Sequence, residues 1–97
     1  MRGSLITEGC EIYGKVERSV LFAGVLVEEG ASVTDSVVMP GAAIRRGALV
    51  QRAILAEDAI IGAGAVVGEE GGDIAVVGEN VRLPAGTTVR AGEQRAK

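Results

Sequence analysis

Aliphatic residues recur along this chain at steps of five or six positions. This ladder runs through Val16, Leu21, Val27, Val33, Val38, Ile44, Val50, Leu55, Ile61 and Val67, and resumes at Val77, Leu83 and Val89. A step of six does not stay on one face of a helix with about 3.6 residues per turn. A β-sandwich would show strands with period-two alternation at a spacing of about 8–12 residues. The ladder instead predicts short strands that each contribute one inward side chain, called a rung below.

A longer repeat of 17 residues contains the ladder. Residues 19–35, 36–52 and 53–69 match in character at most positions, with Gly30, Gly47 and Gly64 aligned. A residue that tolerates positive φ, mostly glycine, stands three places after most six-step rungs, which predicts corners. After the five-step rungs this place holds Ser19, Ser36 or Ala53, which predicts a tighter corner. At the fourth place comes a small or β-branched residue, such as Ala42, Val37 or Ile54, expected in the crowded interior.

These features predict an all-β fold, a triangular β-solenoid of hexapeptide repeats with about five coils. We expect a tail at residues 1–5, the solenoid at residues 6–92 and a polar tail at residues 93–97. Residues 69–73 (EEGGD) interrupt the ladder and predict a turn-rich loop at a corner.

Residues 17 positions apart lie above one another in stacked coils, and we call such a set a column. Opposite charges share columns in three places: Arg18, Asp35, Arg52 and Glu69 alternate, Glu28 lies under Arg45, and Glu29 lies under Arg46. Opposite charges on adjacent strands contribute roughly 0.2–1 kcal/mol each. The columns therefore favour coils that stack in register.

Arginines are also candidates for contact with a phosphorylated effector. Arg45, Arg46 and Arg52 are the candidates, but pairing with the acidic columns is the favoured interpretation. An anion site would need further positive charge from a neighbouring domain or subunit.

An apolar column of Phe22, Met39 and Ala56 has no interior to fill, because each residue directly follows a rung. We interpret Phe22 and Met39, together with Tyr13, as a contact surface for another domain or subunit. The alternative is a set of isolated exposed hydrophobic residues. Cys10 occupies a small-residue position, where we expect a buried and unreactive thiol.

The amino-acid composition excludes several kinds of catalytic and binding site. The chain has no histidine, which excludes Ser-His-Asp and Cys-His catalysis and a histidine-bound metal. Ten basic residues stand against 13 acidic residues and aromatic residues make up 2%, so nucleic acid is not an expected partner. Apolar runs fall short of the roughly 18 residues of a membrane span, and a single cysteine suggests the cytoplasm. We therefore assign no catalytic, cofactor-binding or metal-binding residue.

Three blocks of sequence carry a family resemblance. The blocks SLITEGC (4–10), VERSVLF (16–22) and DSVVMPG (35–41) resemble the C-terminal left-handed β-helix domain of the glucose-1-phosphate adenylyltransferases. The segments IYGKV (12–16) and IAVVGEN (74–80) look more similar to the regulatory subunit than to the catalytic one. The resemblance covers nearly the whole chain, and it is the source of the expected left-handedness.

The resemblance implies a supporting role. The family's enzyme forms ADP-glucose and diphosphate from ATP and glucose 1-phosphate for glycogen biosynthesis, with Mg²⁺, in an N-terminal nucleotidyltransferase domain. The glycine-rich loop of that domain is absent here, so this chain alone is not expected to catalyse. The family's solenoid packs on the catalytic domain, helps build a homo- or hetero-oligomer and forms part of the effector site. The corner Ala56-Glu57-Asp58 is acidic, which argues against phosphate binding there.

Other readings stay open on the sequence. A hexapeptide-repeat acyltransferase or a γ-class carbonic anhydrase is disfavoured by the missing histidine. The solenoid of another sugar-1-phosphate nucleotidyltransferase, or a stand-alone scaffold, would share the ladder. We expect an excised solenoid to self-associate, because its first coil would present unpaired strand edges.

Overall fold

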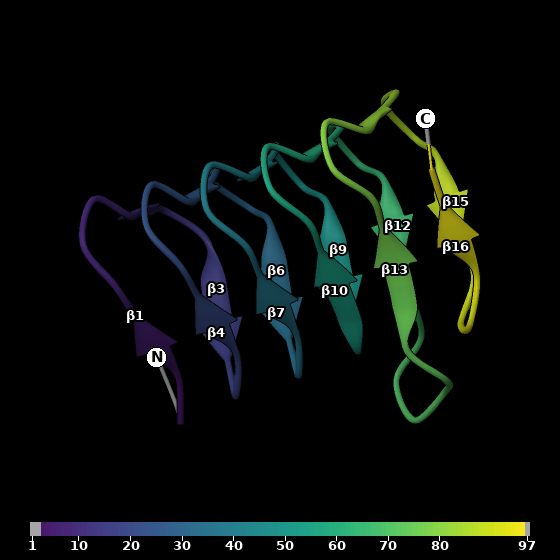
Figure 1. Cartoon of the computed structure of the whole chain (residues 1–97), viewed down its shortest axis with the longest axis horizontal. Coiled ribbons are helices and arrows are strands. Elements are labelled where there is room, and N and C mark those ends of the chain that lie inside the picture. Colours follow the sequence, from purple (N-terminus) through teal and green to yellow (C-terminus); the bar gives the residue numbers. More distant parts are fainter. Residues whose placement is uncertain (1–2, 97) are drawn as a thin grey trace.

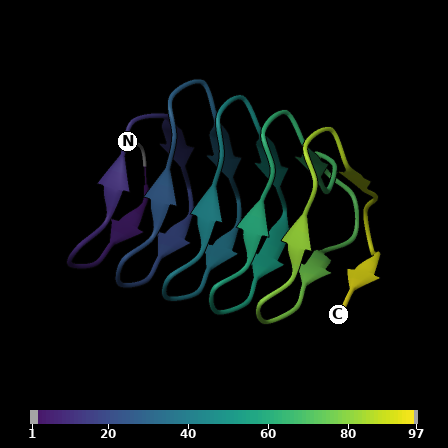
Figure 2. The ribbon, with the colours of Figure 1, turned by 90° about the horizontal axis from the view of Figure 1, so that it is seen from above.

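The computed structural model describes residues 3–96, which form sixteen short β-strands and no helix. Parallel pairing joins these strands into three sheets, which form the three sides of a solenoid. Figures 1 and 2 show the coils side by side, with the N-terminus at one end and the C-terminus at the other. Nowhere in the described part does a helix reach the length and hydropathy needed to cross a membrane. The predicted all-β solenoid of about five coils is confirmed.

Each of the five complete coils contributes one strand to each sheet, and β16 adds a sixth strand to the first sheet. The first sheet contains β1 (Leu5–Ile6), β4 (Val20–Leu21), β7 (Val37–Val38), β10 (Ala53–Leu55), β13 (Ala75–Val77) and β16 (Gln94–Arg95). The second sheet contains β2 (Glu11–Ile12), β5 (Leu26–Val27), β8 (Ala43–Ile44), β11 (Ile60–Ile61) and β14 (Arg82–Leu83). The third sheet contains β3 (Lys15–Glu17), β6 (Ser32–Thr34), β9 (Leu49–Gln51), β12 (Val66–Val67) and β15 (Thr88–Val89).

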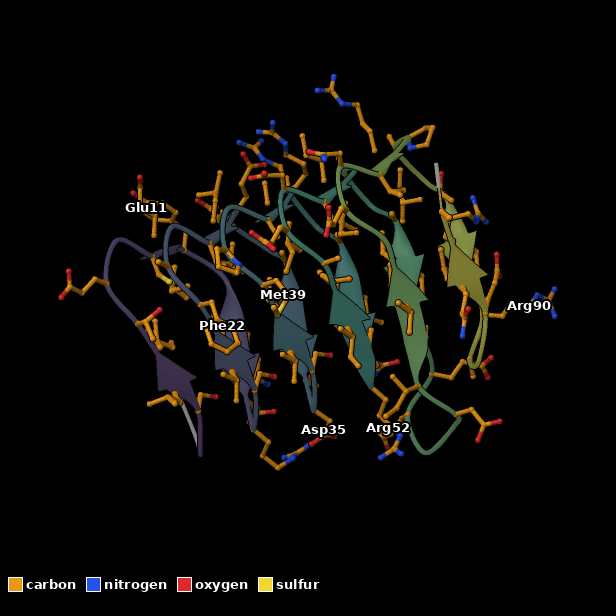
Figure 3. All side chains as sticks on the ribbon, viewed as in Figure 1. Glu11, Phe22, Asp35, Met39, Arg52 and Arg90 are labelled. Atoms are coloured by element: carbon orange, nitrogen blue, oxygen red, sulfur yellow. The ribbon has the colours of Figure 1, made fainter. Side chains whose placement is uncertain are left out.

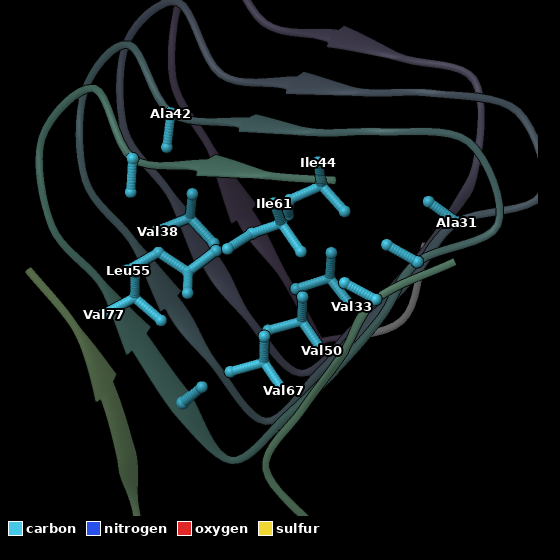
Figure 4. Close-up of a cluster of buried hydrophobic side chains, with 14 of the residues drawn as sticks. Ala31, Val33, Val38, Ala42, Ile44, Val50, Leu55, Ile61, Val67 and Val77 are labelled. Atoms are coloured by element: carbon cyan, nitrogen blue, oxygen red, sulfur yellow. The ribbon is translucent and has the colours of Figure 1, made fainter. Parts of the chain in front are cut away.

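The predicted rungs form the core. Every rung from Val16 to Val67, and the later rungs Val77, Leu83 and Val89, is at most 2% exposed. Their side chains meet in the interior from all three sheets (Figure 4). Rungs of successive coils pair directly, as Leu21 does with Val38 and Val38 with Leu55. The period of 17 residues is therefore one turn of the solenoid.

The tighter corner lies one position earlier than predicted. Positive φ occurs at Arg18, Asp35 and Arg52, two places after the five-step rungs. The next residue, Ser19 or Ser36, is buried. Consequently the fourth-place residues Val37 and Ile54 face outward, and the prediction that they fill the interior is wrong. The shorter step brings the third-place residue inside instead.

Buried serines supply hydrogen bonds at this corner. Ser19 Oγ donates to the Glu17 carbonyl at 2.8 Å and accepts from the Ser36 N–H at 3.1 Å. Ser36 Oγ repeats the pattern with the Thr34 carbonyl and the Ala53 N–H. Among the described side chains, no buried nitrogen or oxygen lacks a partner. The hydroxyl column thus links three successive coils at a point where non-glycine residues carry left-handed backbone strain.

The solenoid extends past its predicted limits at both ends. Strand β1 begins at Leu5, and β16 covers Gln94 and Arg95, which were expected to belong to a polar tail. A corner at Gly92, with φ of 75°, turns the chain back so that β16 can pair with β13. The predicted loop at residues 69–73 projects beside β13, drawn in green in Figure 1. Met1, Arg2 and Lys97 lie outside the described residues.

Candidate functional site

The outer side of the first sheet is apolar along most of the solenoid. The outward residues of its first five strands are Leu5, Val20, Val37, Ile54 and Val76, which pair in register from coil to coil. Phe22, Met39 and Ala56 directly follow three of these strands, and Figure 3 places Phe22 and Met39 on this side. We call these eight residues the apolar face. Leu5 is 62% exposed, Phe22 37% and Ile54 36%, so the face meets solvent.

The other two sheets carry mixed outer sides. Outward residues of the second sheet are Glu11, Leu26, Ala43, Ile60 and Arg82. Those of the third sheet are Lys15, Glu17, Ser32, Thr34, Leu49, Gln51, Val66 and Thr88. Of the three sheets in the described residues, only the first has five neighbouring strands without an outward polar side chain. Contiguous apolar patches on protein surfaces are typical of sites that contact another domain or chain.

Tyr13 does not belong to the apolar face, although the sequence analysis grouped it with Phe22 and Met39. It follows β2 on the second sheet and donates its hydroxyl to Glu11 Oε1 at 2.9 Å. That hydrogen bond, and the charge of Glu11, raise the pKa of Tyr13. Together with Leu26, Glu28, Glu29 and Arg46, its ring lines an open hollow of about 250 Å³.

Cys10 packs against the end of the core and is half-buried. Its Sγ lies 3.1 Å from the Phe22 carbonyl oxygen and donates to it. The thiol is therefore less enclosed than the sequence predicts, because it lies in the first coil, where the described chain covers the core on one side only.

The candidate effector arginines do not converge. Arg45 and Arg46 lie between β8 and β9, where the second sheet meets the third, whereas Arg52 lies between β9 and β10, where the third sheet meets the first. Arg52 donates its Nε–H to the Gly72 carbonyl at 2.7 Å, at the corner shown in Figure 3. Its predicted pairing with Glu69 does not form, since the hydrogen bond to the loop backbone uses the guanidinium instead.

Glu28 organises the other two arginines. Arg45 Nη1 lies 3.1 Å from Glu28 Oε2, as the column predicts. The second oxygen of Glu28 accepts from the backbone N–H of Arg46 at 2.9 Å. In the described structure Glu29 and Arg46 form no ion pair, so that predicted pairing is wrong. The Glu28 carboxylate therefore binds both the Arg45 guanidinium and the Arg46 backbone N–H at this corner. Glu29 and the Arg46 side chain are exposed to solvent.

We expect fructose 1,6-bisphosphate to leave the melting temperature of this chain unchanged. Arg45 and Arg52 are already engaged, and Arg46 alone beside two glutamates offers little attraction to an anion. Thermal unfolding monitored by circular dichroism, with and without the bisphosphate, measures this. A saturable rise in melting temperature would contradict the assignment of these arginines to structural roles.

Arg18 and Asp35 form the predicted ion pair across adjacent coils. Arg18 Nε donates to Asp35 Oδ1 at 2.7 Å and Nη2 to Oδ2 at 3.2 Å, a bidentate geometry. The hydrogen bond from Arg18 holds the pKa of Asp35 below its ordinary value of 3.8. The Arg18 side chain is 58% exposed and that of Asp35 33%, so the pair is screened by solvent and salt.

This lowered pKa predicts a pH dependence of stability. A carboxyl whose pKa is depressed in the folded state stabilises the fold above its ordinary pKa and loses that effect as pH falls through the folded pKa. We expect the melting temperature of the wild type to drop more than that of Asp35→Asn between pH 5 and acidic values below about pH 3. Equal drops in both proteins would show that the ion pair does not contribute.

The described residues contain no group of three carboxylate or thiolate side chains placed to hold a metal ion. What the geometry offers is a rigid, parallel, in-register platform with one apolar side. This arrangement defines the class of a hexapeptide-repeat β-solenoid.

Comparison with known proteins agrees with that class. Residues 1–73 match the family of GlmU-like C-terminal hexapeptide domains, and the chain belongs to this family. Among curated proteins, the chain is 72% identical over 39 residues to the glucose-1-phosphate adenylyltransferases of Bacillus thuringiensis (strain Al Hakam) and Bacillus anthracis. These matches cover 40% of this chain and 10% of each relative. No solved structure matches the chain significantly.

Proposed function

We propose that this chain serves as the C-terminal β-helix domain of a glucose-1-phosphate adenylyltransferase, where it supports the enzyme without performing the chemistry. The observation that carries this proposal is the apolar face of the first sheet, combined with the high identity to the Bacillus adenylyltransferases. In this role the face docks on a nucleotidyltransferase domain or a neighbouring subunit. The reaction, ATP and glucose 1-phosphate to ADP-glucose and diphosphate, and its Mg²⁺ belong to that other domain.

The apolar face has two properties that favour a permanent contact with another domain: apolar surface to bury and side chains in fixed positions. Burying apolar surface contributes roughly 25 cal/mol per Å², and contacts between domains of one chain need less area than a dimer of separate molecules. Because Leu5, Val20, Val37, Ile54 and Val76 project from in-register strands, their positions are fixed before docking. Little side-chain entropy is then lost on contact.

The same proposal includes a homo- or hetero-oligomer in the cytoplasm. A free cysteine is compatible with that reducing compartment. In this proposal the solenoid contributes to regulation by placing residues beside an effector site on the domain or subunit that it contacts. It does not bind the effector alone, because Arg45 and Arg52 already have partners within the solenoid and Arg46 lies apart from Arg52.

A fusion protein tests the proposal. The nucleotidyltransferase domain of the Bacillus anthracis relative is joined to this chain in place of its own C-terminal region. We expect the fusion to form ADP-glucose faster and to unfold at a higher temperature than the same relative truncated before that region. Activity and melting temperature no better than those of the truncated protein would contradict the proposal.

A further inference from the structure

The corner between the second and third sheets is two residues shorter in the first coil than in the other coils. Four residues separate β5 from β6, and four also separate β8 from β9, β11 from β12 and β14 from β15. Only Tyr13 and Gly14 separate β2 from β3. Because β2 pairs in register with β5, and β3 with β6, two corner residues of the second coil, Glu29 and Gly30, have no counterpart in the first.

Gly14 allows the shortened corner to lie flat on the second coil. A Cβ at this position would overlap the carbonyl oxygen of Ala31. On one side of the corner, the Tyr13 N–H still donates to the Val27 carbonyl at 2.8 Å. On the other side, the Lys15 N–H still donates to the Ala31 carbonyl at 2.9 Å. The two residues are therefore missing without any loss of strand pairing.

The shortened corner leaves a backbone donor of the second coil unpaired. At the next two corners of this kind, a glycine N–H donates to the coil before it. Gly47 donates to the Glu29 carbonyl at 3.3 Å, and Gly64 donates to the Arg46 carbonyl at 2.9 Å. The equivalent acceptor for Gly30 would be one of the two residues that the first coil lacks, so its N–H has no hydrogen-bond partner among the described residues. A carbonyl oxygen from another molecule would satisfy this donor.

The hollow of about 250 Å³ lies at this corner. Its lining consists of Tyr13 from the first coil, Leu26, Glu28 and Glu29 from the second, and Arg46 from the third. Tyr13 is 64% exposed, so its ring is accessible from the solvent. Glu29 directly precedes Gly30 in the chain. The hollow thus combines an aromatic ring, an aliphatic side chain and charged groups next to the unpaired N–H.

The charges at the hollow favour a cation. Three carboxylates lie there, those of Glu11, Glu28 and Glu29, against the two guanidinium groups of Arg45 and Arg46. Glu28 is already bound to Arg45, whereas the Glu29 carboxylate forms no ion pair within the described structure. A cationic group that enters the hollow therefore finds an available carboxylate.

We propose that this hollow binds an arginine of a partner polypeptide. The planar guanidinium stacks on the Tyr13 ring and donates to the Glu29 carboxylate, while the arginine stem packs on Leu26. A carbonyl oxygen of the same segment accepts from the Gly30 N–H. The segment thus fills the place of the two residues that the first coil lacks. Because the corner joins the second and third sheets, this contact is separate from the apolar face of the first sheet.

An arginine compound with an amide group on each side tests the proposal. N-acetyl-arginine-N-methylamide is titrated into the ¹⁵N-labelled protein, and the amide chemical shifts are recorded. We expect saturable shifts centred on Tyr13, Glu29 and Gly30, with an affinity about fivefold or more above that of the uncharged citrulline counterpart. Equal affinity for the citrulline compound, or tighter binding of the corresponding glutamate compound, would refute an arginine site.

A matched pair of substitutions tests the role of the carboxylate. Glu29→Gln keeps the shape of the side chain and should weaken binding of the arginine compound about fivefold or more. Glu79→Gln makes the same change at an exposed position between β13 and β14, and it should bind as the wild type does. Wild-type affinity in Glu29→Gln would show that its carboxylate does not hold the guanidinium.

Amide hydrogen exchange tests the shortened corner itself. The Gly30 N–H should exchange about tenfold or more faster than that of Gly47, which is hydrogen-bonded to the coil before it. Inserting Glu-Gly between Tyr13 and Gly14 restores a corner of four residues, so it should slow exchange at Gly30 and abolish binding of the arginine compound. Equal exchange at Gly30 and Gly47 in the wild type, or undiminished binding by the folded insertion variant, would overturn the proposal.

Discussion

Replacing Leu55 by alanine is expected to lower the free energy of unfolding by about 2–5 kcal/mol. Leu55 is fully buried and stands in the middle of the inward column, between Val38 and Val77. The narrow interior is built from rungs of all three sheets, and the coils above and below cannot collapse into a cavity without breaking their strand pairing. Urea unfolding followed by far-ultraviolet circular dichroism gives the free energy.

Ile54→Ala is the matched control, because Ile54 precedes Leu55 in the same strand and projects to the outer side. It is 36% exposed, so its truncation removes fewer contacts and leaves no cavity. We expect a cost below about 1 kcal/mol. If the two variants lost equal stability, the assignment of inward and outward positions in β10 would be wrong.

The second large effect is expected at Gly68, where the chain leaves β12. Gly68 has φ of 76°, and an added Cβ would overlap the carbonyl oxygen of Gln51 in the coil before. Left-handed backbone costs a non-glycine residue about 1–2 kcal/mol, and overpacking adds about 1–3 kcal/mol. We therefore expect Gly68→Ala to lower the free energy of unfolding by about 2–5 kcal/mol.

Gly64→Ala isolates the backbone contribution. Gly64 has a similar φ of 68°, but nothing lies within 4 Å of an added Cβ. Its substitution should cost about 1–2 kcal/mol, the left-handed strain alone. Equal losses at Gly64 and Gly68 in urea unfolding would show that contact with the preceding coil does not matter at this corner.

The rungs could be predicted from sequence because each one has a single requirement, an aliphatic side chain that fills the core. Every rung places one aliphatic side chain in the triangular core, so the pattern is visible as steps of five and six, with Leu21, Ile44 and Leu55 as examples. The ion pairs Arg18–Asp35 and Glu28–Arg45 were predictable for a similar reason, whereas the predicted pairs of Arg52 with Glu69 and of Arg46 with Glu29 do not form. Arg18 and Asp35 lie one coil apart, and the period of 17 residues places them in contact.

The tight corner could not be located to the residue. Arg18 and Arg52 are not residue types that favour positive φ, so nothing local marks them as the turn. Their backbone conformation is imposed by the neighbouring coils and by the hydroxyl of Ser19 or Ser36, which is a tertiary effect. The available signal is the recurrence of serine one position after the turn, at Ser19 and Ser36, where the side chain is buried.

The apolar face was predicted only in part. Phe22 and Met39 stood out because large apolar residues follow a rung, but Val20, Val37 and Ile54 look like interior residues in sequence. The available signal was that the residue before each first-sheet rung is aliphatic, whereas the equivalent positions on the other sheets include Glu11, Lys15, Ser32 and Arg82. Arg95 was assigned to a tail because a charged residue does not fit a ladder of aliphatic rungs.

The most direct test of the docking face compares two lysine substitutions in the fusion with the Bacillus anthracis nucleotidyltransferase domain. Val37 and Leu49 both project outward from the same coil and are both half-buried, but only Val37 belongs to the apolar face. Measured as ADP-glucose formation, Val37→Lys is predicted to lower activity about tenfold or more, because the ammonium group would be buried in the domain contact. Leu49→Lys is predicted to leave activity within about twofold of the unsubstituted fusion. Equal activities of the two variants would contradict docking through the first sheet.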